Sequence, residues 1–167
     1  PDFRIARKAE SQLMRIIDIF LKVITFGMMH NFMTSYATTI GTTLYVSPNW
    51  DGDHPLMKAA LLRHERVHLR QRRRLGPLIY AFAYLFWPLP AVFASARRGF
   101  EQEAYAETLR AYHEYYGDFV LLDRRIRKRI CTEFIGPNYF WTWPFRKDIE
   151  RWYDEVLATL GKPPTEN

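Results

Sequence analysis

Hydrophobic residues recur at spacings of three and four between residues 5 and 29, which predicts an amphipathic helix. The apolar stripe consists of Leu13, Ile16, Ile17, Phe20, Ile24 and Met28. We expect this stripe to pack on a core. Because basic side chains lie mostly off the stripe, association of residues 13–29 with a membrane surface stays open as an alternative.

Residues 38–46, TTIGTTLYV, are rich in β-branched side chains and predict a strand, with Gly41 as a candidate bulge or point of close backbone approach. The loop that follows offers Asp53 as a helix N-cap and Pro55 for the first helical turn. We therefore expect a helix from this loop to about Leu75, where a Gly-Pro pair ends it.

Residues 75–96 carry no charged side chain, and by length alone they are a candidate for crossing a membrane. Two prolines, Pro88 and Pro90, interrupt the segment. Both flanks are strongly basic, whereas a membrane span usually has Lys and Arg concentrated on one side. The pattern favours a buried, hairpin-like segment over membrane insertion.

The remainder of the chain predicts more helices, separated by an aromatic loop with the sequence IGPNYFWTWPF. The predicted helices cover residues 98–116, 118–130 and 145–160. The expected fold class is therefore α+β, mainly α.

The chain of 167 residues is long enough for one domain with a substantial core. We expect a single domain over residues 1–167. Within it we expect an N-terminal helix (1–37), a functional core (38–116), and C-terminal helices with a tail (117–167).

The net charge and the cysteine content bear on the possible partners and on the cellular location. The net charge of +6 permits nucleic acid, an anionic membrane or an acidic peptide as partners. Basic runs are most often solvated helix faces, and we expect this of residues 70–74 and 124–129. A single cysteine excludes an internal disulfide framework, and no signal peptide is evident, so we expect a cytoplasmic location.

The predicted helix before Leu75 contains the stretch His64-Glu65-Arg66-Val67-His68. Positions i and i+4 share one helix face, so the two histidines can present ring nitrogens to one metal ion. Glu65 lies beside them and can reach a metal-activated water as a general base. This spacing indicates a zinc site with its catalytic base.

A catalytic zinc usually has three protein ligands. The metzincin continuation is absent, because Gln71 and Arg74 stand where its glycine and third histidine belong. The best candidate is Glu101, which shares a predicted helix face with a small residue, Ala104. Glu103 and other acidic residues stay open. A membrane-spanning segment at 75–96 would separate His68 from Glu101 by ~30 Å, so a shared ion and a simple span exclude each other.

The motif HERVH followed by FEQEAYAETL resembles the gluzincin metallopeptidases, and most closely the small single-domain proteins of bacterial and phage type. The strand TTIGTTLYVSP is similar to the zincin edge strand that binds extended peptide. The resemblance covers residues 38–110. It implies a zincin-like fold with an active-site helix, a small edge sheet or strand and a second ligand-bearing helix.

The resemblance also implies roles for individual residues: zinc ligands His64, His68 and Glu101, and Glu65 as general base. Many gluzincins carry Asp or Asn four residues after the ligand glutamate, where this chain has Tyr105. Tyr105 is thus a candidate to support a ligand or to donate to the oxyanion. The other candidates for these roles are Glu107 and Asp118 as acceptors, and His113 and Tyr139 as oxyanion donors.

The predicted function is zinc-dependent hydrolysis of a peptide bond in a protein or peptide substrate, the activity of a metalloendopeptidase. Two alternatives stay open. One is a non-catalytic zincin-like protein that binds metal and a partner. The other is a basic protein that binds nucleic acid through its arginine-rich helices.

Overall fold

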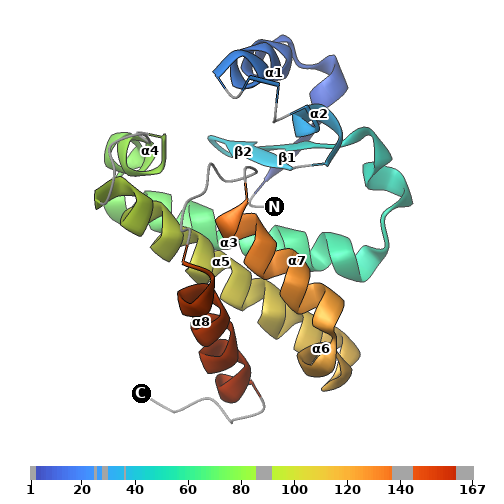
Figure 1. Ribbon diagram of the computed structural model, residues 1–167. Coiled ribbons are helices and arrows are strands. Elements are labelled where there is room, and N and C mark those ends of the chain that lie inside the picture. Colours follow the sequence, from blue (N-terminus) through green and yellow to red (C-terminus); the bar gives the residue numbers. More distant parts are fainter. Residues whose placement is uncertain are drawn as a thin grey trace. The chain divides into compact units, whose positions relative to one another are not determined.

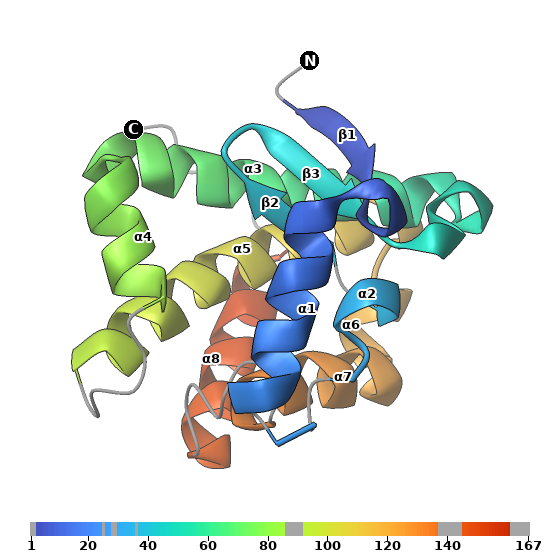
Figure 2. The ribbon, with the colours of Figure 1, turned by 90° about the horizontal axis from the view of Figure 1, so that it is seen from above.

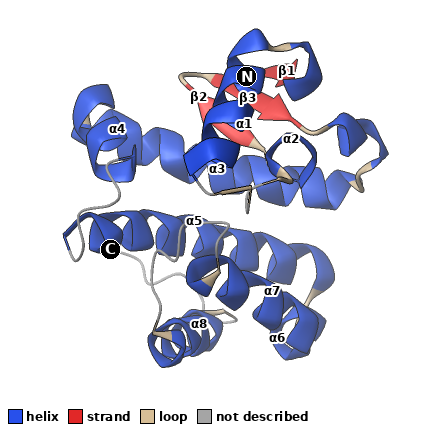
Figure 3. Ribbon diagram, turned by 45° about the horizontal axis from the view of Figure 1, so that its top comes forward, coloured by secondary structure: helices blue, strands red, loops and turns tan. Residues whose placement is uncertain are grey.

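The computed structural model describes residues 3–24, 26–27, 30–35, 37–85, 92–136 and 145–160. The chain is mainly helical with a small three-stranded sheet, which confirms the predicted α+β, mainly α class (Figures 1 and 3). Its contacts gather into two compact units, Pro1–Lys58 and Ala59–Asn167, and each is described by itself. The expectation of a single domain stays a prediction.

The first unit contains the sheet, with strands β1 (Arg4–Arg7), β2 (Thr38–Ile40) and β3 (Thr43–Val46). Figure 2 shows the strands side by side, in the order β1-β3-β2. Strand β1 runs parallel to β3, and β2 runs antiparallel to it. The predicted single strand over 38–46 is thus a hairpin, because Gly41 adopts a φ of 65° that allows a tight reversal there.

Helix α1 (Gln12–Ile24) is shorter than predicted, because residues 4–7 form β1 and a 3-10 turn, Lys8–Glu10, follows. Pairing of β1 with the distant strand β3 supplies backbone hydrogen bonds that a local pattern cannot reveal. The predicted buried stripe is partly wrong, since Ile16 and Phe20 are 64% and 60% exposed. The buried side of α1 instead carries Met14 and Asp18.

The rest of the first unit is short. It comprises helix α2 (Phe32–Ser35), the 3-10 turn Pro48–Gly52 and the start of α3 (Pro55–Leu75). Helix α3 extends from there into the second unit, and its end at Leu75 is as predicted.

The second unit is helical throughout its described residues. After α3 come α4 (Pro77–Leu85), α5 (Val92–Tyr116), α6 (Phe119–Leu122), α7 (Arg124–Ile135) and α8 (Arg146–Thr159). The predicted helix over 118–130 is two helices, because Asp123 accepts a hydrogen bond from the Arg125 backbone and caps a new start.

A core cluster joins α5, α7 and α8 within this unit. Its fully buried members are Leu109, Phe134, Ile149 and Tyr153, and Cys131 lies among them as a free thiol. This packing holds α5 in place from the side that α7 and α8 cover.

The charge-free segment 75–96 is divided by Gly76, whose φ of 81° separates α3 from α4. Helix α4 then packs on α5. The expected burial is wrong for Leu78 and Ile79, which are 85% and 63% exposed. Pro88 and Pro90 lie outside the described residues, as does most of the aromatic loop with Tyr139. Among the helices that are described, none is both long and apolar enough to cross a membrane.

Candidate metal centre

Helices α3 and α5 lie side by side and antiparallel in the second unit (Figure 3). At one end of the pair, Arg63 donates to Glu107 over 2.7 Å. At the other end, Gln71 donates to Glu103 over 2.8 Å. These contacts cross from α3 to α5 in opposite chain order, so the two helices are aligned along the stretch of α3, about two turns long, that contains the histidine pair.

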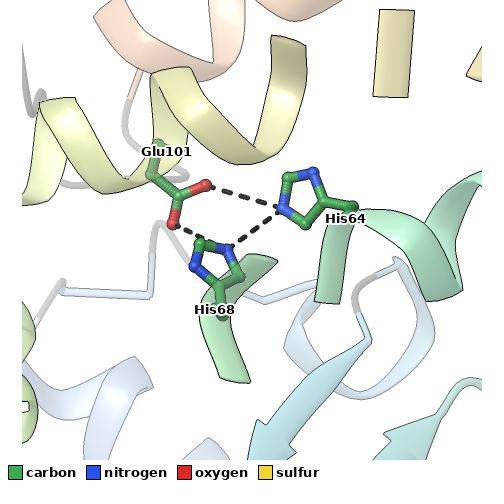
Figure 4. A group of neighbouring side chains, drawn as sticks. All are labelled: His64, His68 and Glu101. Atoms are coloured by element: carbon green, nitrogen blue, oxygen red, sulfur yellow. Dashed lines mark hydrogen bonds and ion pairs between the residues drawn. The ribbon is translucent and has the colours of Figure 1, made fainter. Parts of the chain in front are cut away.

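His64 and His68, on the stretch of α3 between these two contacts, and Glu101 of α5 point toward one another (Figure 4). The Nε2 atoms of the histidines are 3.2 Å apart. The Glu101 carboxylate oxygens lie 3.8 Å from Nε2 of His64 and 3.7 Å from Nε2 of His68. All three potential ligand atoms lie within 4.8 Å of one another. The side chains predicted as metal ligands are therefore brought together in one buried place.

The protonation of His64 follows from its outer contact. Its Nδ1 lies 3.1 Å from the hydroxyl of Thr108. That hydroxyl donates to the backbone carbonyl of Ala104 over 3.3 Å, so it can only accept from His64. The proton of the neutral ring is thus on Nδ1, and Nε2 turns a lone pair toward Glu101 and His68.

The protonation of His68 follows from Gln71 in the same way. The amide nitrogen of Gln71 donates to the Phe100 carbonyl at 3.0 Å and to Glu103 at 2.8 Å. Both neighbours are acceptors, so the amide oxygen must face His68, whose Nδ1 lies 3.0 Å away and donates to it. Nε2 of His68 therefore also presents a lone pair.

Two ring nitrogens without protons and a carboxylate then face one another. In these tautomers the two Nε2 atoms, 3.2 Å apart, have no proton between them. Glu101 is 1% exposed, and its Oε2 has no hydrogen-bond partner among the described residues. A buried carboxylate in this state costs free energy unless a positive charge compensates it. The donor set of two imidazoles and one carboxylate fits a zinc ion.

Burial reinforces the neutral state of His64. Desolvation lowers the pKa of its ring well below the ordinary value, and the neighbouring His68 lowers it further. A neutral ring keeps the Nε2 lone pair available over a wider pH range, as a metal ligand requires.

Tyr84, on α4, is a member of the site that sequence reasoning missed. Its hydroxyl donates to Oε1 of Glu101 over 2.5 Å. Burial, and then the charge of Glu101, raise the pKa of this phenol well above its usual range, so it stays a donor. Tyr84 lies in the charge-free segment 75–96, and its hydroxyl within that apolar stretch is the sequence signal that could have indicated it.

Glu65, the predicted general base, is 8% exposed on the adjoining face of α3. It lies close enough to Tyr80 that its charge, after burial and Glu101, helps to raise the pKa of that phenol. Glu65 is therefore a poorly exposed carboxylate on the motif helix, within electrostatic range of Tyr80 on α4.

The residues predicted to support the histidines or to stabilise an oxyanion make other contacts. The ring of Tyr105 packs edge-on against His64, with 4.8 Å between the ring centres. Glu107 is bonded to Arg63, and Asp118 to His113 at 2.8 Å. The outer contacts of the two histidines come instead from Thr108 and Gln71, the second of which sequence reasoning used only to exclude the metzincin pattern.

Comparison with protein families, curated proteins and solved structures finds no match to this chain. The assignment of the site therefore depends on the residues themselves.

Proposed function

We propose that this chain is a zinc-dependent peptide hydrolase of the gluzincin type, with a zincin-like arrangement of its two ligand-bearing helices. The observation that carries the proposal is the convergence of Nε2 of His64, Nε2 of His68 and the carboxylate of Glu101 in one buried place. The hydrogen bonds of Thr108 and Gln71 support it, because they leave both Nε2 atoms unprotonated.

Each residue has a distinct part in the proposed reaction. His64, His68 and Glu101 hold the zinc, which when bound lowers the pKa of water and polarises a carbonyl group. Glu65 takes up the proton of the attacking water and later delivers it to the leaving amine. Glu65 directly follows the ligand His64 on α3 and is only 8% exposed, so it is a candidate for this role by its place on the motif helix.

Retention of Glu65 favours an enzyme over a protein that only binds a metal and a partner. A structural zinc site is usually closed by four protein ligands, whereas three ligands and a neighbouring carboxylate are typical of a catalytic site. Among the described residues, the grouping of possible ligands consists of the two histidines and Glu101.

The first test is a zinc analysis of purified wild type, Glu101→Ala and Glu103→Ala. We expect about one zinc per chain in the wild type and loss of stoichiometric zinc in Glu101→Ala, because one of three ligands is gone. Glu103→Ala should keep stoichiometric zinc, because Glu103 lies outside the group of converging ligand atoms and reaches His68 only through Gln71. Zinc retained in Glu101→Ala but lost in Glu103→Ala would assign the third ligand to Glu103.

The second test separates catalysis from binding. Glu65→Gln should retain zinc and lose cleavage of an unstructured protein such as casein, since the amide cannot accept the water proton. Glu155→Gln, at an exposed position on α8, is the matched control and should cleave as the wild type does. A zinc-loaded wild type that cleaves no protein or peptide would favour the partner-binding alternative.

A further inference from the structure

The hydrogen bond from Tyr84 leaves the two oxygens of Glu101 in different surroundings. Oε1 accepts from the phenol over 2.5 Å. Oε2 has no hydrogen-bond partner among the described residues and lies 3.8 Å from Nε2 of His64. Oε1 lies equally near a histidine, 3.7 Å from Nε2 of His68, so the distances do not distinguish the two oxygens. The difference between them is the donor from α4, which occupies Oε1 and leaves Oε2 to bind a cation.

The position of the Tyr84 ring is itself determined by several neighbours. It stacks on Tyr80, with ring centres 5.6 Å apart and planes 28° apart. The Arg97 guanidinium lies 4.9 Å above its centre, and the His68 ring meets it edge-on at 6.0 Å. A ring held from these sides keeps its phenol oxygen in place next to Glu101, so the donor stays within hydrogen-bond reach of Oε1.

We propose that Tyr84 is a positioning residue: its hydroxyl fixes the Glu101 carboxylate so that Oε2 is presented to the metal. This inference rests on the proposed zinc site. It gives the apolar segment that contains α4 a role in the site, because that segment carries the donor which orients the third ligand. A carboxylate held in its ligating orientation binds the ion without first losing rotational freedom.

The test compares Tyr84→Phe with Tyr80→Phe. The first variant keeps the ring and its packing and removes only the hydroxyl that reaches Glu101. The second removes a hydroxyl from the ring stacked on it. Zinc affinity is measured by competition with a chromophoric chelator, and the visible spectrum is recorded with cobalt in place of zinc.

We expect Tyr84→Phe to lose zinc affinity by roughly 10–100-fold, as for other groups that hold a metal ligand, and to change its cobalt spectrum. Tyr80→Phe should match the wild type in both. In a Glu101→Ala background, Tyr84→Phe should have no further effect on affinity, because its target is absent. A purely structural role of the hydroxyl would leave the cobalt spectrum unchanged.

Equal zinc affinity in Tyr84→Phe and wild type would overturn the positioning role while leaving the zinc site intact. Equal losses in Tyr84→Phe and Tyr80→Phe would also overturn it, since the effect would then not be specific to the hydroxyl that reaches Glu101. A wild type that binds no zinc would instead refute the proposed function. If Tyr84→Phe fails to fold, 3-fluorotyrosine at position 84 keeps the ring and alters only the donor strength, and an unchanged zinc affinity there would count against the role.

Discussion

At the scale of single residues, the candidate metal centre depends on two histidines whose Nδ1 atoms contact Thr108 and Gln71 and whose Nε2 atoms face each other. For His68 the acceptor is Gln71, whose amide is oriented by Phe100 and Glu103. Here a glutamine amide stands between the histidine and the carboxylate, so the influence of Glu103 reaches His68 through one intervening side chain.

Gln71→Ala should lower zinc affinity by roughly 10–100-fold, because it removes the acceptor that orients the His68 ring. Chelator competition measures the change. Gln102→Ala, one residue along α5 from Glu101, is the control and should bind zinc as the wild type does. Unaltered affinity in Gln71→Ala would mean that the ring of His68 is oriented by packing alone.

The buried His64 makes the stability of the metal-free protein depend on pH. Its pKa in the folded chain lies well below the value of 6.5 expected after unfolding. Between these two values the unfolded chain binds the extra proton, so the free energy of unfolding rises with pH in that window. The contribution is complete above pH 6.5 and is lost progressively as the pH falls from 6.5 toward the folded pKa.

Chemical denaturation of the metal-free chain between pH 7.5 and pH 5 checks this expectation. The decline in unfolding free energy should be shallower in His64→Gln than in the wild type. His30→Gln, at an exposed position, should keep the wild-type slope. A slope that is the same in all three proteins would show that His64 does not titrate differently in the folded state.

At the scale of secondary-structure elements, the site depends on the close approach of α5 to α3. Ala104 is fully buried on the face of α5 that carries Glu101 and Thr108. A small side chain there allows the two helices to come near enough for Thr108 to reach His64 at 3.1 Å. This face of α5 thus combines one small residue, Ala104, with a polar residue on either side of it, Glu101 and Thr108.

Ala104→Leu should therefore destabilise the chain by about 1–3 kcal/mol, because a larger side chain overpacks the interface. It should also weaken zinc binding, since α5 has to move away from α3. Denaturant unfolding and zinc competition measure the two effects. The same change at Ala158, which is exposed on α8, should alter neither, and an equal response at both sites would contradict the argument.

The parts of the fold that could be predicted are those encoded by local spacing. The helix carrying His64 and His68 and the helix carrying Glu101 both follow from periodicity and from the Gly-Pro pair after Leu75. Strand β1 could not be predicted, since its partner β3 is distant in the chain. The buried face of α1 could not be predicted either. Met14 is buried there by tertiary packing, whereas members of the regular apolar stripe such as Ile16 and Phe20 are exposed.

The site shows the same division. The spacing of His64 and His68 depends only on helix geometry, and the search for a third ligand singled out Glu101 because a small residue shares its face. The contributions of Tyr84 and Thr108 depend on how α4 and α5 pack, which no single segment encodes. Gln71 lies on the motif helix itself, three residues after His68, and could have been recognised from that spacing.

At the scale of the whole molecule, the net charge of +6 does not by itself assign a nucleic-acid partner. Part of the positive charge is used within the second unit. Arg127, in the basic run of α7, is bonded through both terminal nitrogens to Asp154 of α8. Arg63 on α3 is likewise bonded to Glu107 and Glu114. These ion pairs join neighbouring helices. They also reduce the number of basic side chains that could bind the phosphate groups of a nucleic acid.

If a single ion binds both α3 and α5, it links the two helices. Removing the metal should therefore lower the stability of the whole folded chain. A ligand that binds only the folded chain stabilises it by about 2.7 kcal/mol at a hundred times its dissociation constant. For a chain of this length that corresponds to a rise in melting temperature of roughly 5–10 °C.

We expect saturating zinc to raise the melting temperature of the wild type, and a chelator to reverse the rise. Glu101→Ala should show little of this response, because the ion loses the ligand from α5 and no longer joins it to α3. An equal rise in both proteins would mean that zinc stabilises the chain elsewhere, for example through exposed histidines, and the link between the two helices through a metal would have to be abandoned.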